Sequence, residues 1–134
     1  MKKVIFICTG NACRSQMAEG FLKHYQSNEY KVYSAGTNPT RVHPAAIKVM
    51  SELNINISNH TSDHINDFLD KKIDIVITVC DDANQKCPIF PGSQKSIHWS
   101  IEDPFINWSD NENLLDPYRK CRDTIEKRIK EFIN

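Results

Sequence analysis

Short, continuously apolar runs alternate along the chain with longer segments of helical spacing. Lys3–Cys8 and Asp74–Val79 are runs rich in β-branched residues, which is typical of strands buried on both faces of a parallel sheet. Lys31–Ala35 is predicted as a further strand that ends at Gly36, and Lys95–Trp99 as a weaker one. The chain therefore predicts a sheet of four strands.

Apolar residues return every three to four positions in the segments that follow the strands. This spacing predicts a helix over Arg14–Gln26, another that begins near His43 with Pro44 in its first turn, and a last helix over Asp116–Phe132. The polar stretch Ser100–Leu115 lacks such a period and is expected to be a long loop.

This order of strands and helices predicts an α/β fold: a single domain over residues 1–134, with helices on both faces of a four-stranded parallel sheet, in three layers. Such sheets bind ligands outside the carboxyl ends of their strands, where the strand order reverses. Cys8 and Cys80 both stand at carboxyl ends of predicted strands. We therefore expect them to be neighbours in space.

Composition and charge narrow the classes of function. The 134 residues are 40% hydrophobic and 25% charged, with a formal net charge of +0, which gives no basic footprint for nucleic acid. No apolar run approaches membrane-spanning length, and the run after Lys3 is too short for the core of a signal peptide. We expect a cytoplasmic monomer without nucleic-acid or membrane partners.

The sequence has five cysteines: Cys8, Cys13, Cys80, Cys87 and Cys121. A reducing compartment and an odd count argue against a framework of structural disulfides. Their spacings differ from those of common zinc sites, and no pair of histidines completes a ligand set. Catalytic or redox use is the better interpretation.

The segment after the first strand has the residues of an oxyanion-binding loop: Cys8, Thr9, Gly10, Asn11, Ala12, Cys13, Arg14 and Ser15. Its backbone N–H groups can converge on an anion, and Gly10 permits the positive φ that such loops often need. Arg14 opens a helix whose dipole favours negative charge, and its guanidinium can hold two anionic oxygens. The same field stabilises a Cys8 thiolate, to which Ser15 can donate. The alternative is that Cys8 is simply a small buried residue at a strand end.

This loop and the Gln-Met-Ala-Glu-Gly that follows it resemble the opening of the thioredoxin-coupled arsenate reductases, which share the fold and anion loop of the low-molecular-weight protein tyrosine phosphatases. The resemblance implies a flavodoxin-like topology. It extends over nearly the whole chain, in the segments Val-Tyr-Ser-Ala-Gly (32–36), Ile-Ser-Asn-His-Thr-Ser-Asp (57–63), Val-Ile-Thr-Val-Cys (76–80), Cys-Pro (87–88) and His-Trp-Ser-Ile-Glu-Asp-Pro (98–104).

The resemblance implies that Cys8, Arg14 and Ser15 have the same roles in either family. It also implies that the aspartate of an Asp-Pro pair is the general acid. Asp103 is expected to be that residue because Ile-Glu-Asp-Pro matches the family segment. Asp116, in a second Asp-Pro pair, is expected to begin the last helix instead.

Cys80 and Cys87 favour reduction over hydrolysis, since a phosphatase needs neither. The resemblance implies that Cys8 attacks arsenate, that Cys80 attacks the Cys8 sulfur and releases arsenite, and that Cys87 then attacks Cys80. Thioredoxin reduces the final disulfide. If residues 81–86 are helical, Cys80 and Cys87 lie roughly 10 Å apart, so this segment would have to unwind for a disulfide to form.

The leading hypothesis is thus an arsenate reductase with a role in arsenic detoxification. A low-molecular-weight tyrosine phosphatase, and a non-catalytic oxyanion-binding or redox-sensing domain, are the alternatives. Cys13 has no step in the reductase scheme, and Cys121 lies on the apolar stripe of the last helix, where a core position is expected.

No cofactor is required by this scheme, but some members of the resembled family hold a potassium ion beside the loop. The matching positions are Asn11, Glu19, Ser34 and Asp63. All carry side-chain oxygens, as a hard cation requires. The alternative is a hydrogen-bonded polar cluster, in which Asn11 braces the loop.

Overall fold

The computed structural model describes residues 1–134 and has a parallel sheet at its centre. Its strand order is β2-β1-β3-β4. The strands are β1 (Lys2–Cys8), β2 (Tyr30–Gly36), β3 (Ile75–Thr78) and β4 (Lys95–His98). The central strands β1 and β3 are the continuously apolar runs of the sequence, and Val4, Phe6 and Ile77 in them are buried. Cys8 is the last residue of β1, and Cys80 follows the adjacent strand β3, in which Thr78 pairs with Ile7. The two cysteines expected to be neighbours therefore stand at the ends of adjacent strands.

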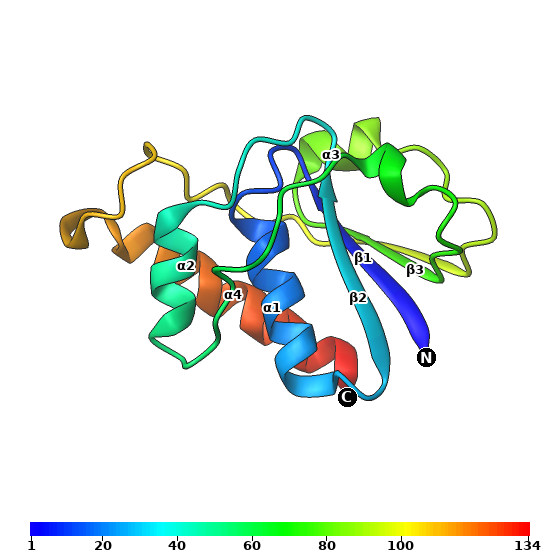
Figure 1. Ribbon diagram of the computed structural model, residues 1–134, viewed down its shortest axis with the longest axis horizontal. Helices are drawn as coiled ribbons and strands as arrows, with labels where there is room; N and C mark the ends of the chain where they lie inside the picture. Colours follow the sequence, from blue (N-terminus) through cyan, green and yellow to red (C-terminus); the bar gives the residue numbers. More distant parts are fainter.

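Helices cover one face of the sheet, and shorter elements cover the other (Figure 1). On the first face, α1 (Arg14–Gln26) packs against β1 and β2, and α2 (Pro44–Ser51) and α4 (Asp116–Ile133) pack against α1. On the second lie the 3-10 turn η1 (Ile65–Phe68) and the short helix α3 (Asp81–Lys86), and a last 3-10 turn, η2 (Glu112–Leu114), precedes α4. The predicted single-domain, three-layer α/β fold with a four-stranded parallel sheet is confirmed.

Two details around the start of α4 differ from expectation. The stretch predicted to be one loop contains η2, because the Asn111 side chain accepts a hydrogen bond from Asn113 N at 3.0 Å and starts a 3-10 turn. Helix α4 begins at Asp116, as predicted, but Leu115 is its N-cap residue and no side chain caps it. The Asp116 carboxylate accepts from Arg119 instead, at 2.9 Å.

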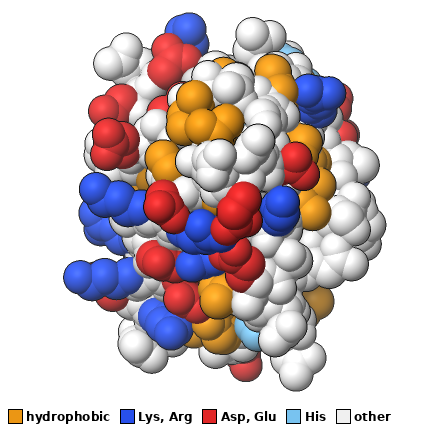
Figure 2. Space-filling model, turned by 90° about the vertical axis from the view of Figure 1, so that its left-hand side faces the viewer, with side chains coloured by type: hydrophobic (Ala, Val, Ile, Leu, Met, Phe, Trp, Pro, Cys, Tyr) orange, Lys and Arg blue, Asp and Glu red, His pale blue; other side chains and the backbone are white.

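Acidic and basic side chains interleave on the face beside α2 and the start of α4 (Figure 2). Arg119 is ion-paired with Glu52, Glu112 and Asp116, and Arg122 shares Glu52 at 2.7 Å. The opposite charges on this face therefore neutralise one another locally. None of the helices combines the length and hydropathy that crossing a membrane requires.

Candidate active site

The loop after β1 forms a cup around the Cys8 sulfur. Asn11 N donates to Cys8 Sγ at 3.2 Å, and Ser15 Oγ lies 2.9 Å from the same sulfur. Ser15 Oγ accepts from Asn11 Nδ2 at 2.7 Å, which leaves the Ser15 proton free to point at Cys8. Two donors thus converge on a buried sulfur at the start of a 13-residue helix, an arrangement that stabilises a thiolate.

The backbone of the cup corrects one expectation from the sequence. The positive φ of the loop belongs to Asn11, at 48°, and not to Gly10. Asparagine tolerates this conformation, and here its side chain fixes it by donating to Ser15 and Ser34 and accepting from Asp63 N. Asn11 is therefore the brace of the cup.

Gly36, at the end of β2, is a requirement of the cup that the sequence did not reveal. A Cβ at this position would lie 2.5 Å from the carbonyl oxygen of Thr9 and 3.0 Å from Asn11 N. A backbone carbonyl cannot move aside to relieve such a clash, as the end of a flexible side chain can. The chain after β2 also donates back to the loop, from Thr37 N to Cys8 O and from Asn38 N to Thr9 O. Only glycine permits this close approach of two chain segments.

A buried glutamine in the first turn of α1 ties the cup to the segment near residue 61. Gln16 Nε2 donates to Asn11 O at 2.9 Å and to Thr61 O at 2.8 Å, while its Oε1 lies 3.0 Å from His60 Nδ1. No pattern in the sequence indicates this role, because glutamine on a helix usually faces solvent.

Arg14 and Asp103 meet at the mouth of the cup. Arg14 Nη2 lies 3.6 Å from Asp103 Oδ2, and Nη1 donates to Ile101 O at 3.0 Å. The Arg14 side chain is only 13% exposed, whereas that of Asp103 is 58% exposed. Asp103 thus lies at the mouth of the cup, beside Arg14 and in contact with solvent.

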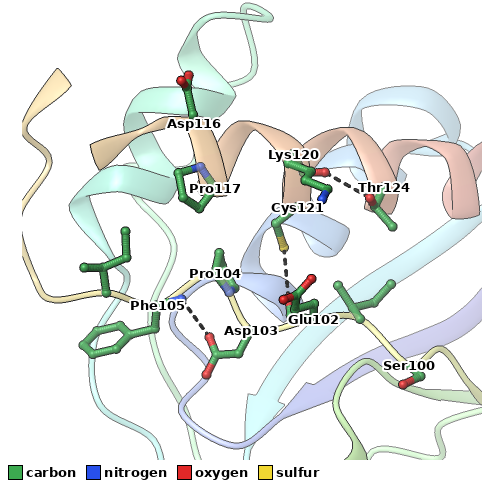
Figure 3. A pocket seen from close by; sticks show the side chains of 12 residues that line it. Ser100, Glu102, Asp103, Pro104, Phe105, Asp116, Pro117, Lys120, Cys121 and Thr124 are labelled. Atoms are coloured by element: carbon green, nitrogen blue, oxygen red, sulfur yellow. Dashed lines mark hydrogen bonds between the residues drawn. The ribbon is translucent and has the colours of Figure 1, made fainter. Parts of the chain in front are cut away.

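A groove of about 660 Å³ runs behind Asp103, between its loop and α4 (Figure 3). In Figure 3, Pro104 lies below Pro117 of α4, whereas the Asp103 carboxylate points away from this helix. The wall of the groove includes Cys121, whose thiol lies 3.9 Å from Glu102 O. Burial raises the pKa of Cys121 to about 12. This thiol is therefore unreactive at neutral pH, as expected for a core cysteine.

His43 holds the other end of the Asp103 loop. Its Nδ1 accepts from Ala45 N at 2.9 Å, so Nε2 carries the proton and donates to Asn107 O at 2.6 Å. The ring stacks on Trp108 with centroids 5.0 Å apart and lies 3.1 Å from the Tyr118 hydroxyl. Burial lowers the pKa of His43, in agreement with a neutral ring. This buried hub was not predicted, since its partners come from three separate segments.

Cys80 and Cys87 delimit one short helix, α3, beside the cup. Cys80 is its N-cap residue, and its Sγ accepts from Ala83 N at 3.3 Å; Cys87 is the C-cap residue. Thr9 Oγ1, one residue after Cys8, lies 3.4 Å from Cys80 Sγ. Cys80 is buried and Cys87 half-buried, and burial raises the pKa of Cys87. All five cysteines are free thiols.

Cys13, the remaining cysteine of the loop, is also buried. Burial and the neighbouring Cys8 raise the pKa of Cys13 well above its ordinary value. It is therefore held as a neutral thiol, which suits a residue that fills space behind the loop.

The residues matched to a potassium site form a connected polar cluster. Ser34 Oγ donates to Glu19 Oε1 at 2.6 Å, and Lys23 Nζ pairs with Glu19 Oε2 at 2.5 Å. The Asp63 carboxylate is turned to Thr61 Oγ1, at 2.6 Å. The oxygens are of the kind that a hard cation binds, but hydrogen bonds and the Lys23 ammonium already satisfy them. Potassium binding stays a prediction, and no chemical step below depends on it.

A family profile, low molecular weight phosphotyrosine protein phosphatase, matches residues 3–134. The chain belongs to this family. Within the phosphatase family, it is 48% identical over 132 residues to the arsenate reductase of Shouchella clausii, an alignment that covers 98% of this chain and 95% of the relative.

Solved structures of arsenate reductases are also similar to this chain. An arsenate reductase in the phosphate-binding state has a TM-score of 0.84 and 38% identity, covering 99% of this chain and 97% of the other. A thioredoxin-dependent arsenate reductase of Corynebacterium glutamicum has a TM-score of 0.76 and 32% identity; the match covers 98% of this chain but 60% of that one. The expected family resemblance is confirmed.

Proposed function

We propose that this protein reduces arsenate to arsenite with electrons from its own cysteines, and that thioredoxin restores them. One observation carries the proposal: Cys80 and Cys87 stand at the two ends of one short helix, and the N-terminus of this helix contacts Thr9 of the Cys8 cup. Hydrolysis alone has no use for such a pair. The arsenate reductases among its relatives, one of them thioredoxin-dependent, support the same assignment.

Binding of the oxyanion is the task of the cup. The backbone N–H groups of residues 9–15, together with the N-terminus of α1, favour a tetrahedral oxyanion above the Cys8 sulfur. Arg14 exchanges its contact with Asp103 for two oxygens of the anion. The thiolate of Cys8 attacks arsenic, and a hydroxyl group of the arsenate leaves as water when Asp103, once it has taken up a proton from solvent, donates that proton to it. The product of this step is a covalent Cys8–arsenic(V) adduct.

Reduction follows when the Cys80 thiolate attacks the Cys8 sulfur. A Cys8–Cys80 disulfide forms, the sulfur–arsenic bond breaks, and its electron pair stays on arsenic, which leaves as arsenite. Cys87 then attacks Cys80, so that a Cys80–Cys87 disulfide forms and Cys8 departs as a thiolate. Thioredoxin supplies two electrons and two protons to the last disulfide. Across the seven positions from Cys80 to Cys87 an intact α3 spans about 10 Å, so the helix must open in this sequence.

Coupled turnover tests the proposal. Arsenate is supplied with thioredoxin, thioredoxin reductase and NADPH, and NADPH oxidation is followed beside the hydrolysis of an aryl phosphate by the same preparation. We expect arsenate-dependent NADPH oxidation. Hydrolysis without arsenate reduction would assign a phosphatase, and neither activity would leave an oxyanion-binding or redox-sensing domain; each of these results overturns the proposal.

A further inference from the structure

The hydroxyl of Thr9 connects Cys80 to a carboxylate on α3. Thr9 Oγ1 donates to Asp82 Oδ2 at 2.9 Å and lies 3.4 Å from Cys80 Sγ. The hydrogen bond from Thr9, and then that from Lys86, lowers the pKa of Asp82. Asp82 is thus a carboxylate at neutral pH, and a carboxylate can only accept hydrogen bonds.

The direction of these hydrogen bonds follows from counting protons. A threonine hydroxyl has one proton, and Asp82 takes it. Thr9 can therefore offer Cys80 only a lone pair. The contact between Thr9 and Cys80 is a hydrogen bond only when Cys80 carries its own proton and donates it. A Cys80 thiolate would face an oxygen lone pair.

A second contact acts on the same sulfur in the opposite sense. Ala83 N, in the first turn of α3, donates to Cys80 Sγ at 3.3 Å, which favours a thiolate. The sulfur therefore lies between a group that favours its charged form and one that favours its neutral form. The balance between thiol and thiolate at Cys80 therefore depends on whether Thr9 donates its proton to Asp82 or to the sulfur.

We propose that Asp82 is a positioning residue that, through Thr9, holds Cys80 as a thiol while α3 is intact. The inference rests on the proposed function. When α3 opens, the sulfur loses the donor Ala83 N, but Asp82 moves away as well. The hydroxyl of Thr9 then donates to the sulfur in place of Ala83 N, and Cys80 loses its own proton to water. The thiolate can then attack the Cys8 sulfur as described above. Asp82 thus ties the nucleophilicity of Cys80 to the conformation of α3.

The other charged groups near Cys80 are already paired, so they do not replace Asp82 in this role. Asp81 accepts from His98 Nε2 of β4 at 2.8 Å, and Lys86 pairs with Asp82 itself at 3.1 Å. From the cup, the Cys8 sulfur is held by Ser15 and Asn11, and Arg14 is paired with Asp103. Of the carboxylates of α3, only Asp82 contacts Thr9.

The test measures how fast iodoacetamide alkylates Cys80 in the reduced full-length protein between pH 5 and 10, with each cysteine resolved by mass spectrometry. Asp82→Ala places a good helix former in α3, so the helix is kept, and it frees the proton of the Thr9 hydroxyl. We expect Cys80 alkylation at pH 7 to become about tenfold faster, with the midpoint of the profile about one pH unit lower.

Asp81→Ala is the matched control, since it removes the same charge from the same helical turn without touching Thr9; less than a twofold change is expected. Thr9→Val removes the hydroxyl, and in that background Asp82→Ala should have no further effect. Unchanged or slower alkylation in Asp82→Ala would overturn the inference. So would an acceleration that persists with Val at position 9, or an equal one in Asp81→Ala. The alkylation assay needs no arsenate. It can therefore contradict the role of Asp82 while the turnover assay still supports the proposed function, and the reverse is equally possible.

Discussion

The cup around Cys8 and the helix α3 lie side by side but are built in different ways. In the cup, Asn11 and Ser15 are fully buried. The Asn11 side chain donates to Ser34 of β2 and to Ser15, and accepts from Asp63 N. Helix α3 has six residues, of which only Ala83 is buried. Side-chain contacts hold it to the strands, such as Thr78 with Asn84 at 3.1 Å. An isolated helix of this length is unstable in water.

The difference matches the chemistry of each region. An oxyanion site gains from donors that are fixed before the ligand arrives, because no energy is then spent on reorganisation during the reaction. A segment that must bring two distant thiols together gains from low local stability. The comparison predicts that changes in the cup act on binding and chemistry, and that changes in α3 act on the later steps.

The largest effect is expected from Cys8→Ser in the cup. A serine hydroxyl is not ionised at neutral pH, so arsenate turnover should fall by at least about 10³-fold. Phosphate should still bind, because the backbone donors and Arg14 are untouched. Turnover and phosphate titration calorimetry measure the two properties. Retention of more than a tenth of the turnover would show that Cys8 is not the nucleophile.

Cys87→Ser at the end of α3 should stop the enzyme after one turnover. In the proposed relay, arsenite is released when Cys80 attacks Cys8, and without Cys87 no thiol remains to attack the Cys8–Cys80 disulfide. Rapid-quench analysis should find at most one arsenite per protein molecule. Cys121→Ser, which changes a thiol that burial keeps protonated, is the control and should turn over normally. Multiple turnover by Cys87→Ser would disprove the relay.

Gly36→Ala tests how fixed the cup is. The new Cβ would meet Thr9 O at 2.5 Å, so the loop must shift, and we expect about 1–3 kcal/mol of lost stability with weaker phosphate binding. Urea unfolding and phosphate titration measure both. Gly10→Ala is the matched control, since its Cβ meets Thr40 Oγ1 only at an ordinary 3.4 Å. Equal losses in the two variants would contradict the close approach at Gly36.

Oxidation to the Cys80–Cys87 disulfide tests the mobility of α3. The amides of residues 81–90 should exchange about tenfold faster or more in the oxidised protein, because the helix cannot span its own disulfide. The amides of residues 9–15 should keep their protection. Hydrogen–deuterium exchange with peptide resolution measures both regions in one sample. Matching exchange of residues 81–90 in the two redox states would rule out the opening of α3.

Potassium is expected to have the smallest effect. Because Lys23 already supplies a positive charge to Glu19, the interpretation as a hydrogen-bonded cluster predicts that melting temperatures in potassium chloride and in choline chloride of equal ionic strength agree within about 1 °C. Differential scanning fluorimetry measures the shift, and Lys23→Met shows whether the lysine is the reason. A clear stabilisation of the unaltered protein by potassium would instead indicate a bound ion.

The sequence predicted the parts of the molecule that depend on local pattern. The strands of Ile and Val, the helix after Arg14 and the position of Cys80 at a strand end all follow from periodicity and turn signals. The resemblance to a known family added Asp103, which indeed lies beside Arg14. These features need no knowledge of how distant segments approach one another.

Other features of the site arise only when distant segments meet. The need for glycine at position 36 comes from the Thr9 carbonyl, and the positive φ at Asn11 is fixed by partners in β2 and near residue 63. His43 could be recognised as the start of a helix, but its contact with Trp108 depends on a loop without any period. Such contacts leave no signal in the local pattern of residues.

The pairing of β1 with β3 has a consequence for how such an enzyme can arise. Adjacent parallel strands lie about 4.8 Å apart, so a residue just after β3 stands beside the cup whatever its side chain. A cysteine at such a position therefore stands beside Cys8 without any special path of the backbone. In this fold, adding a second thiol next to the first is a matter of one side chain.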